Sequence, residues 1–220
     1  MFNNLIILLL SIQFIYTQQT VEGSPYSLLF GLESNIHTEV MPQVDEEQLF
    51  YEDGHRAPGT PFRYGYIHEL NYSMENSGLW EETENGGNLW RVSIQSFSAK
   101  AIGIEYDNFY LPPGSELFVY SPGYEMILGA YTNTNNPEGG RFATPLLMGD
   151  HVIIEYYAPA EVSVTPSLTI IEVIHDYRDI MNYSTDSREW ECGVNVICET
   201  DEIYQGPIDA VAFLDIGGFI

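Results

Sequence analysis

The sequence predicts an all-β protein whose main part, residues 89–180, folds as an antiparallel β-sandwich of a jelly-roll-like kind. Apolar and polar residues alternate from Leu89 to Gln95, which is the pattern of a strand with one buried face. Further short apolar stretches follow at a spacing of ~8–12 residues, with turn residues between them, as in sandwiches and barrels. Because no stretch shows a long helical period, we expect strands throughout.

The expected strands are short and most are bounded by Pro, Gly or Asn. They are Leu89–Gln95, Ala101–Tyr106, Glu116–Tyr120, Met126–Tyr131, Phe142–Pro145, His151–Tyr157 and Ser167–His175. The turns at Leu111–Ser115 and Ser121–Gly123 contain Pro and Gly, which interrupt strands. On these strands we expect Trp90 in the core, and Tyr156 and Tyr157 on opposite faces.

The first 88 residues divide into two parts. Residues 1–19 are predicted to be a secretory signal peptide, because the apolar run Leu5–Tyr16 has the length of its hydrophobic region and is too short to span a membrane. A buried N-terminal helix is the alternative. Residues 20–88 are acidic and rich in turn residues, and we expect an irregular segment with a short helix or turn at Asp45–Leu49. Secretion is the expected localisation.

The charge of the chain is strongly negative. Its 220 residues include 7 Lys+Arg and 32 Asp+Glu, a formal net charge of -25. Such a surface repels nucleic acids and anionic lipid, so neither is an expected partner. The acidity favours solubility, and an acidic face for calcium or a basic partner is the alternative. The acidic turns Asp45–Glu47 and Glu81–Glu84 would supply calcium oxygens in that case.

Cys192 and Cys198 are the two cysteines of the chain, and β-branched residues lie between them. Six residues of extended chain span roughly 20 Å, whereas a disulfide needs Cα atoms within about 7 Å. If this stretch is a strand, the two cysteines cannot pair with each other, and their partners are missing. The polar residues 181–191 precede them and are predicted to be a linker between domains.

The run Cys-Gly-Val-Asn-Val-Ile-Cys at 192–198, followed by Gly-Pro-Ile-Asp-Ala-Val-Ala-Phe-Leu at 206–214, resembles the mature amino terminus of bacterial lysyl endopeptidase-like serine proteases, which have the trypsin fold. Four upstream blocks resemble the pro-region of the same proteases: Trp90–Ile94, Leu111–Tyr120, Gly149–Pro159 and Val173–Arg178.

The resemblance implies a precursor with a pro-region before residue 192 and the incomplete start of a trypsin-like β-barrel at 192–220. It implies that Cys192 and Cys198 bond to later cysteines, and that the pro-region assists folding of, or inhibits, a cognate protease domain. The bond between Arg188 and Glu189 is the candidate processing site. The catalytic His, Asp and Ser of the family have no counterpart in this chain, so we expect no peptidase activity.

The residues alone indicate no active site, metal site or cofactor. The sequence contains no nucleophile motif of the Gly-x-Ser-x-Gly kind. It contains five histidines: His37, His55, His68, His151 and His175. His175 and Asp176 are adjacent on an expected strand, so their side chains face opposite ways and cannot form a dyad. We expect His175 to be packed or hydrogen-bonded within the sandwich. The alternative function is a stand-alone secreted β-sandwich module that binds a glycan or a protein.

Overall fold

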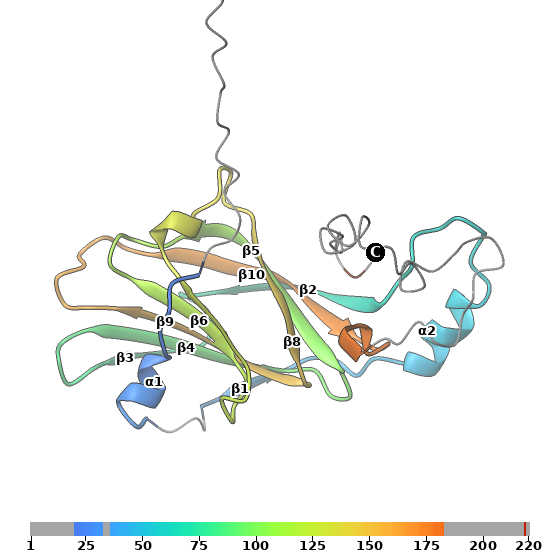
Figure 1. Ribbon diagram of the computed structural model, residues 1–220, viewed down its shortest axis with the longest axis horizontal. Coiled ribbons are helices and arrows are strands. Elements are labelled where there is room, and N and C mark those ends of the chain that lie inside the picture. Colours follow the sequence, from blue (N-terminus) through green and yellow to red (C-terminus); the bar gives the residue numbers. More distant parts are fainter. Residues whose placement is uncertain (1–19, 33–35, 183–217, 219–220) are drawn as a thin grey trace, which may run out of the picture.

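The computed structural model describes residues 20–32, 36–182 and 218. Ten strands in this part of the chain form two sheets, which lie as two layers (Figure 1). One sheet has the order β1-β4-β9-β6-β7, with β3 also paired to β4, and the other has the order β2-β10-β5-β8. All pairs are antiparallel except β1 with β4. The protein is therefore mostly β, as predicted.

The strands are numbered in the order in which they occur along the chain. They are β1 Thr38–Val40, β2 Gly65–Ser73, β3 Leu79–Glu82, β4 Asn88–Gln95, β5 Ala101–Tyr110, β6 Glu116–Tyr120, β7 Ile127–Tyr131, β8 Phe142–Met148, β9 His151–Ala158 and β10 Ser167–Asp176. The helical elements are α1 Tyr26–Leu29, α2 Glu46–Asp53, and the 3-10 turns η1 Asn133–Asn135 and η2 Ile180–Asn182.

A single large core lies between the two sheets. Trp90, Val92 and Ile94 of β4 contribute to it from one sheet, and Ile170 and Val173 of β10 from the other. Residues at every second position of β4 share a face, and burial of that face stabilises the fold by roughly 25 cal/mol per Å² of apolar surface. Trp90 is fully buried, as predicted.

The two neighbouring tyrosines of β9 lie on opposite faces, as predicted. Tyr156 belongs to the core between the sheets. Tyr157 is on the outer face, where its ring stacks on Tyr26 with a centroid distance of 3.6 Å.

All seven strands expected after residue 88 are present as β4 to β10. Two of them are longer than expected: β5 reaches Tyr110, and β8 continues through Pro145 to Met148. Pro145 is tolerated because β8 is an edge strand, where one side of the backbone forms no ladder bonds.

The structure differs from the expectation of an irregular segment at 20–88, because β1, β2 and β3 of the sheets come from this range. The expected helix at Asp45–Leu49 is present and longer, as α2. Its N-cap is Asp45, whose carboxylate accepts a hydrogen bond from the Gln48 amide at 2.9 Å, and two glutamates fill the first turn.

Residues 20–32, which we name the strap, lie on the outer face of the six-stranded sheet. Val21 and Ala130 of β7 exchange two backbone hydrogen bonds of 3.0 and 2.9 Å, so the strap begins as an added strand. Beneath the strap, Phe118, Tyr120 and Ile153 form a second apolar cluster. The strap therefore covers apolar surface on a face that would otherwise be open to water.

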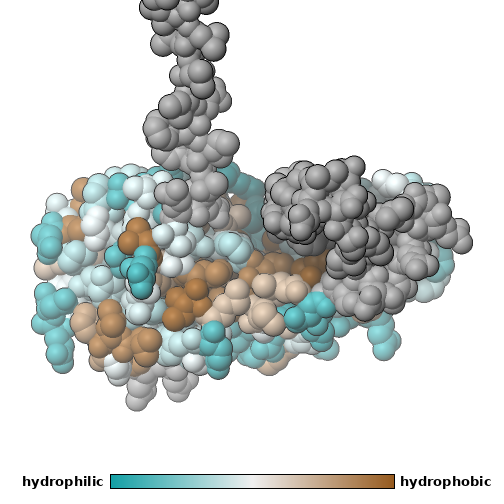
Figure 2. Space-filling model, viewed as in Figure 1, coloured by the Kyte–Doolittle hydropathy of each residue, from teal (hydrophilic) through white to brown (hydrophobic). Residues whose placement is uncertain are grey.

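The surface carries exposed apolar side chains along β8. Ala143, Pro145 and Met148 are exposed, and Leu146 is half-buried. Figure 2 shows hydrophobic residues gathered across the middle of one face, over the region where β6 and β8 lie in Figure 1. Among the described helices, none combines the length and the apolar character needed to cross a membrane.

Several predictions fall on residues outside the described part. These are the signal peptide 1–19, the processing site at Arg188 and Glu189, the cysteines Cys192 and Cys198, and the trypsin-like segment 192–220 apart from Gly218. Of the expected linker 181–191, only Met181 and Asn182 are described, and they end η2.

Candidate functional site

The end of the sheets beside α2 carries a network of charged side chains centred on Asp53. The Asp53 side chain is only 8% exposed. Its Oδ1 accepts from Arg63 Nε at 2.9 Å, and its Oδ2 accepts from the Tyr177 hydroxyl at 2.6 Å and from Arg178 Nη2. One carboxylate thus joins α2 to the loop before β2 and to the end of β10.

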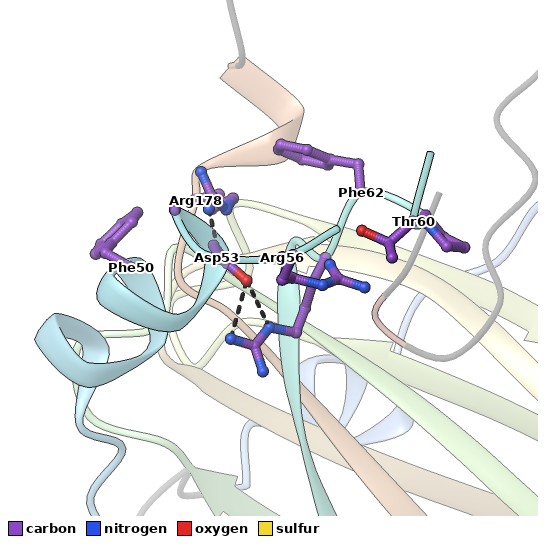
Figure 3. A pocket seen from close by; sticks show the side chains of 9 residues that line it. Phe50, Asp53, Arg56, Thr60, Phe62 and Arg178 are labelled. Carbon is purple, nitrogen blue, oxygen red and sulfur yellow. Dashed lines mark hydrogen bonds and ion pairs between the residues drawn. The ribbon is translucent and has the colours of Figure 1, made fainter. Parts of the chain in front are cut away.

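Arg178 lies between two aromatic rings in this network. Its guanidinium is 5.0 Å from the ring centre of Phe50 and 4.9 Å from that of Phe62. Such cation–π contacts gain strength when the cation is desolvated, and the Arg178 side chain is only 11% exposed. Figure 3 shows Arg178 between Phe50 on α2 and Phe62 on the loop before β2.

These residues line a cavity of about 370 Å³. Its walls are Phe50, Asp53, Gly54, Arg56, Thr60, Pro61, Phe62, Arg63 and Arg178. Cavities of roughly 300–1,000 Å³ with apolar walls and a few placed polar groups are typical ligand sites. We therefore treat this cavity, which we name the arginine pocket, as the candidate functional site.

The protonation states in the pocket follow from its contacts. Burial by itself would raise the pKa of Asp53, but hydrogen bonds from Tyr177 and Arg178 and the charges of both arginines hold it below its ordinary value. Asp53 and Tyr177 keep the pKa of Arg178 above its ordinary value in spite of burial. Asp53 and Arg178 therefore both stay charged at neutral pH.

The chain leaves the sheets next to this pocket. The buried Asp176 carboxylate accepts from the backbone amides of Arg178 and Ile180 at 2.8 and 2.9 Å, which fixes the turn into η2. Gly218 lies at the same end, where its carbonyl accepts from the Tyr64 and Gly65 amides at 2.9 and 3.0 Å. A Cβ on Gly65 would lie 2.6 Å from Ile174 Cγ2 and 3.3 Å from the Gly218 Cα, so this approach requires glycine.

A serine, a histidine and a carboxylate meet behind this end of the sheets. Ser96 Oγ lies 2.7 Å from His175 Nδ1, and His175 Nε2 lies 3.5 Å from Glu46 Oε1 of α2. The same hydroxyl lies 3.4 Å from His68 Nε2. Ser96 is 1% exposed and His175 is fully buried, so a substrate cannot reach the hydroxyl. His175 is buried and hydrogen-bonded as predicted, and Glu46 links α2 to the turn after β4 by accepting from the Ser98 hydroxyl.

The buried histidines predict a loss of stability in acid. Burial, with a smaller contribution from the charge of His175, lowers the pKa of His68 to about 4, and burial also lowers the pKa of His175 despite Glu46 and Asp176 nearby. The unfolded chain protonates these rings below about pH 6.5, whereas the folded chain does not. The free energy of unfolding should fall as the pH drops from about 6.5 to 4, by about 3 kcal/mol for His68.

Urea unfolding at pH 7, 6, 5 and 4 measures this dependence. Carboxylates also titrate in this range, so the test compares the chain with His68→Gln, which should have a flatter profile between pH 6.5 and 4. His37→Gln is the matched control, because the His37 side chain is 86% exposed. A His68→Gln profile parallel to that of the unchanged chain would contradict the assignment.

A second cavity lies at the opposite end of β4, where the β2–β3 turn meets the end of β9. It has a volume of about 380 Å³ and includes Glu75, Trp80, Asn88 and Tyr156 in its lining. Trp80 is 42% exposed, and its Nε1 donates to the Met74 carbonyl at 2.9 Å, which fixes the ring. A fixed and partly exposed indole beside polar groups is suited to stacking on a ligand.

The acidic turns considered for calcium have other contacts. Asp45 caps α2, Glu46 accepts from Ser98 and lies near His175, and Glu81 pairs with Arg91. Within residues 20–32, 36–182 and 218, no group of three or more His, Cys, Asp or Glu could hold a metal ion.

The sequence prediction did not anticipate the arginine pocket. It named Arg178 as the end of a motif block, without a role, and it included Arg56 and Arg63 in the segment that was expected to be irregular. The sequence did contain one signal for this site, which is that Lys and Arg are scarce. Three of the seven Lys and Arg residues line this one cavity. No family model matches the chain.

Proposed function

We propose that this chain is the pro-region of a secreted trypsin-like serine endopeptidase precursor, together with the first strands of the protease domain. The two described sheets would be a jelly-roll-like antiparallel β-sandwich, and residues 192–220 the start of a trypsin-like β-barrel. The observation that carries the proposal is the pair of mainly antiparallel sheets built from residues 38–176, because an all-β pro-region is what the resemblance implies.

The positions of the resembling blocks also support this proposal. The block Gly149–Pro159 contains β9 and its buried Glu155, and Leu111–Tyr120 contains β6. The block Val173–Arg178 ends with side chains that fix the end of the sheets beside the pocket. The motifs thus coincide with residues that organise the fold, and the exposed apolar side chains of β8 offer a further contact surface for a protease domain.

The first test is for peptidase activity of the pure chain. We expect no hydrolysis of lysyl or arginyl amide substrates, because the two serines that contact His175 and His151, Ser96 and Ser93, are each only 1% exposed. Hydrolysis that a serine-directed inhibitor abolishes would contradict the proposal.

The second test concerns assistance in folding. The protease domain beginning at Cys192 in the full precursor is refolded with and without the purified chain. We expect the chain to raise the recovered activity at least about tenfold, because a non-local β-barrel folds slowly and a preformed domain can template it. Equal recovery in both reactions would contradict a pro-region role.

The cavity beside Trp80 favours a second candidate function, a secreted module that binds a glycan. Soluble chito-, cello- and malto-oligosaccharides are titrated against the chain, and we expect one class to bind. Trp80→Ala should weaken that binding at least about tenfold, which is the loss of one stacked ring. Tyr51→Ala is the control, because Tyr51 is an exposed aromatic residue on α2. An unchanged affinity of Trp80→Ala, or no binding of any sugar, would exclude this function.

A further inference from the structure

The cavity beside Trp80 has one charged residue in its lining, which is Glu75. The other lining residues have side chains that are uncharged at neutral pH: Met74, Trp80, Asn88, Tyr156, Ala158, Val162, Ser163, Val164, Thr165 and Pro166. Glu75 is exposed, and it forms no ion pair with another described residue. An exposed residue in a cavity lining lies at the opening, so the opening of this cavity carries one negative charge.

The wall that contains Glu75 and Trp80 is fixed by contacts of the β2–β3 turn. The Glu75 amide donates to the Ser73 hydroxyl at 3.2 Å, and the Trp80 indole donates to the carbonyl of Met74 at 2.9 Å. The Trp80 ring also packs edge-on against the buried Tyr156, with a centroid distance of 5.9 Å. The backbone of the carboxylate and the plane of the indole are therefore set before a ligand arrives, so little ordering opposes binding.

These two groups restrict the class of sugar that suits the cavity. The apolar face of a sugar ring can stack on the partly exposed Trp80 ring. A substituent of that ring at the opening meets the Glu75 carboxylate, which attracts a protonated amine and repels a second carboxylate. The formal net charge of the chain, -25, acts in the same direction. Acidic sugars are therefore disfavoured, and sugars with a free amine are favoured over neutral ones.

We propose that the Trp80 cavity prefers amino sugars, with Trp80 stacking on the sugar ring and Glu75 pairing with the protonated amine. The inference rests on the glycan-binding function proposed for this cavity, and it names the class of ligand. N-acetylation removes the positive charge of the amine, so N-acetylated sugars belong with the neutral ligands.

Two disaccharides that differ at one position of each ring test the proposal. They are β-1,4-linked diglucosamine and cellobiose, which carry an amine and a hydroxyl at carbon 2. Calorimetric titration of the whole chain is done at pH 6, where an ordinary amine is protonated and a carboxylate is ionised. We expect a Kd on the order of 1 mM for diglucosamine and at least about fivefold weaker binding of cellobiose. Digalacturonate should bind more weakly than cellobiose.

Each other outcome has a distinct meaning. Equal affinity for diglucosamine and cellobiose, or tighter binding of digalacturonate, would overturn the preference and leave glycan binding intact. No binding of any of these sugars up to ~50 mM would overturn the preference together with the glycan function. Lysinamide also carries two positive charges but has no sugar ring, so it should bind at least about tenfold more weakly than diglucosamine. Equal binding of lysinamide would show attraction to the acidic surface alone and would overturn the proposal.

Variants connect the preference to Glu75. Glu75→Gln should give diglucosamine and cellobiose the same affinity, with the affinity for cellobiose unchanged, because only the charge is removed. Glu161→Gln is the matched control, since Glu161 is an exposed carboxylate next to the lining residue Val162 and does not itself line the cavity. Trp80→Ala should weaken the binding of both sugars. Far-ultraviolet circular dichroism checks that each variant is folded. A preference for diglucosamine that persists in Glu75→Gln, or that disappears equally in Glu161→Gln, would overturn the assignment.

Discussion

Replacing Glu155 with alanine is expected to lower the free energy of unfolding by about 3–5 kcal/mol and to detach the strap. Glu155 is fully buried on β9, on the outer face of the six-stranded sheet. Its carboxylate accepts from the Tyr26 amide at 2.5 Å, the Ser27 amide at 3.2 Å and the Tyr120 hydroxyl at 2.7 Å. Alanine would leave the two amides without this acceptor and would open a cavity beneath the strap, while the Tyr120 hydroxyl would keep only Ser27 Oγ at 2.8 Å.

Urea unfolding measures the change in stability, and hydrogen exchange of the Val21 and Ala130 amides measures detachment of the strap. Both amides should lose protection in Glu155→Ala, because their mutual bonds hold the start of the strap to β7. Glu155→Gln keeps the size and one acceptor oxygen, so we expect a smaller loss of about 1–3 kcal/mol. Glu161→Ala is the control, since Glu161 is an exposed turn residue. Similar losses in Glu155→Ala and Glu161→Ala would show that the buried carboxylate does not anchor the strap.

The sequence predicted the strands in which apolar residues are frequent or alternate with polar residues. In β9 the apolar residues are frequent enough to mark a strand. The alternation of β4 predicted a strand with one buried face, and that was wrong in one respect, because nearly every side chain of both strands is buried on one face or the other. The sequence did not predict β2 and β3, because polar residues interrupt their apolar pattern. His68 and Glu69 lie in the middle of β2, and Glu81 and Glu82 end β3. Their pairing with β10 and β4 decides their structure, and that pairing is non-local.

The polar sites could not be predicted, because each joins residues far apart in the chain. Asp53 and Arg178 are 125 positions apart, and Ser27 and Glu155 are 128 positions apart. The local pattern placed Asp53 after a short helix or turn at Asp45–Leu49, and it placed Glu155 on an apolar strand. A buried glutamate among Val152, Ile153 and Ile154 was nevertheless a signal, since charged residues are almost never fully buried unless they are paired.

Replacing Asp53 with alanine is expected to lower the free energy of unfolding by about 3–5 kcal/mol, because it removes the shared partner of two arginines. Arg63 and Arg178 side chains are 19% and 11% exposed, so their charges would remain in a poorly solvated site. The Tyr177 hydroxyl would lose its acceptor as well, and Tyr177 packs with Val44 and Leu49 in the apolar cluster that seats α2. We therefore expect α2 to separate from the sheets before they unfold.

The neighbouring residue supplies a matched control on the same helix. Glu52 pairs with the same Arg63 at 3.1 Å, but its side chain is 47% exposed, so Glu52→Gln should leave the stability nearly unchanged. Denaturant unfolding gives the stability of both variants, and fluorescence or hydrogen exchange at α2 reports its release. If Asp53→Ala and Glu52→Gln had the same small effect, the charges at this end would act as an ordinary solvated surface. A large loss confined to Asp53→Ala would instead identify one buried carboxylate as the link between α2, the loop before β2 and the end of β10, which is the framework on which Arg178 is presented to the pocket.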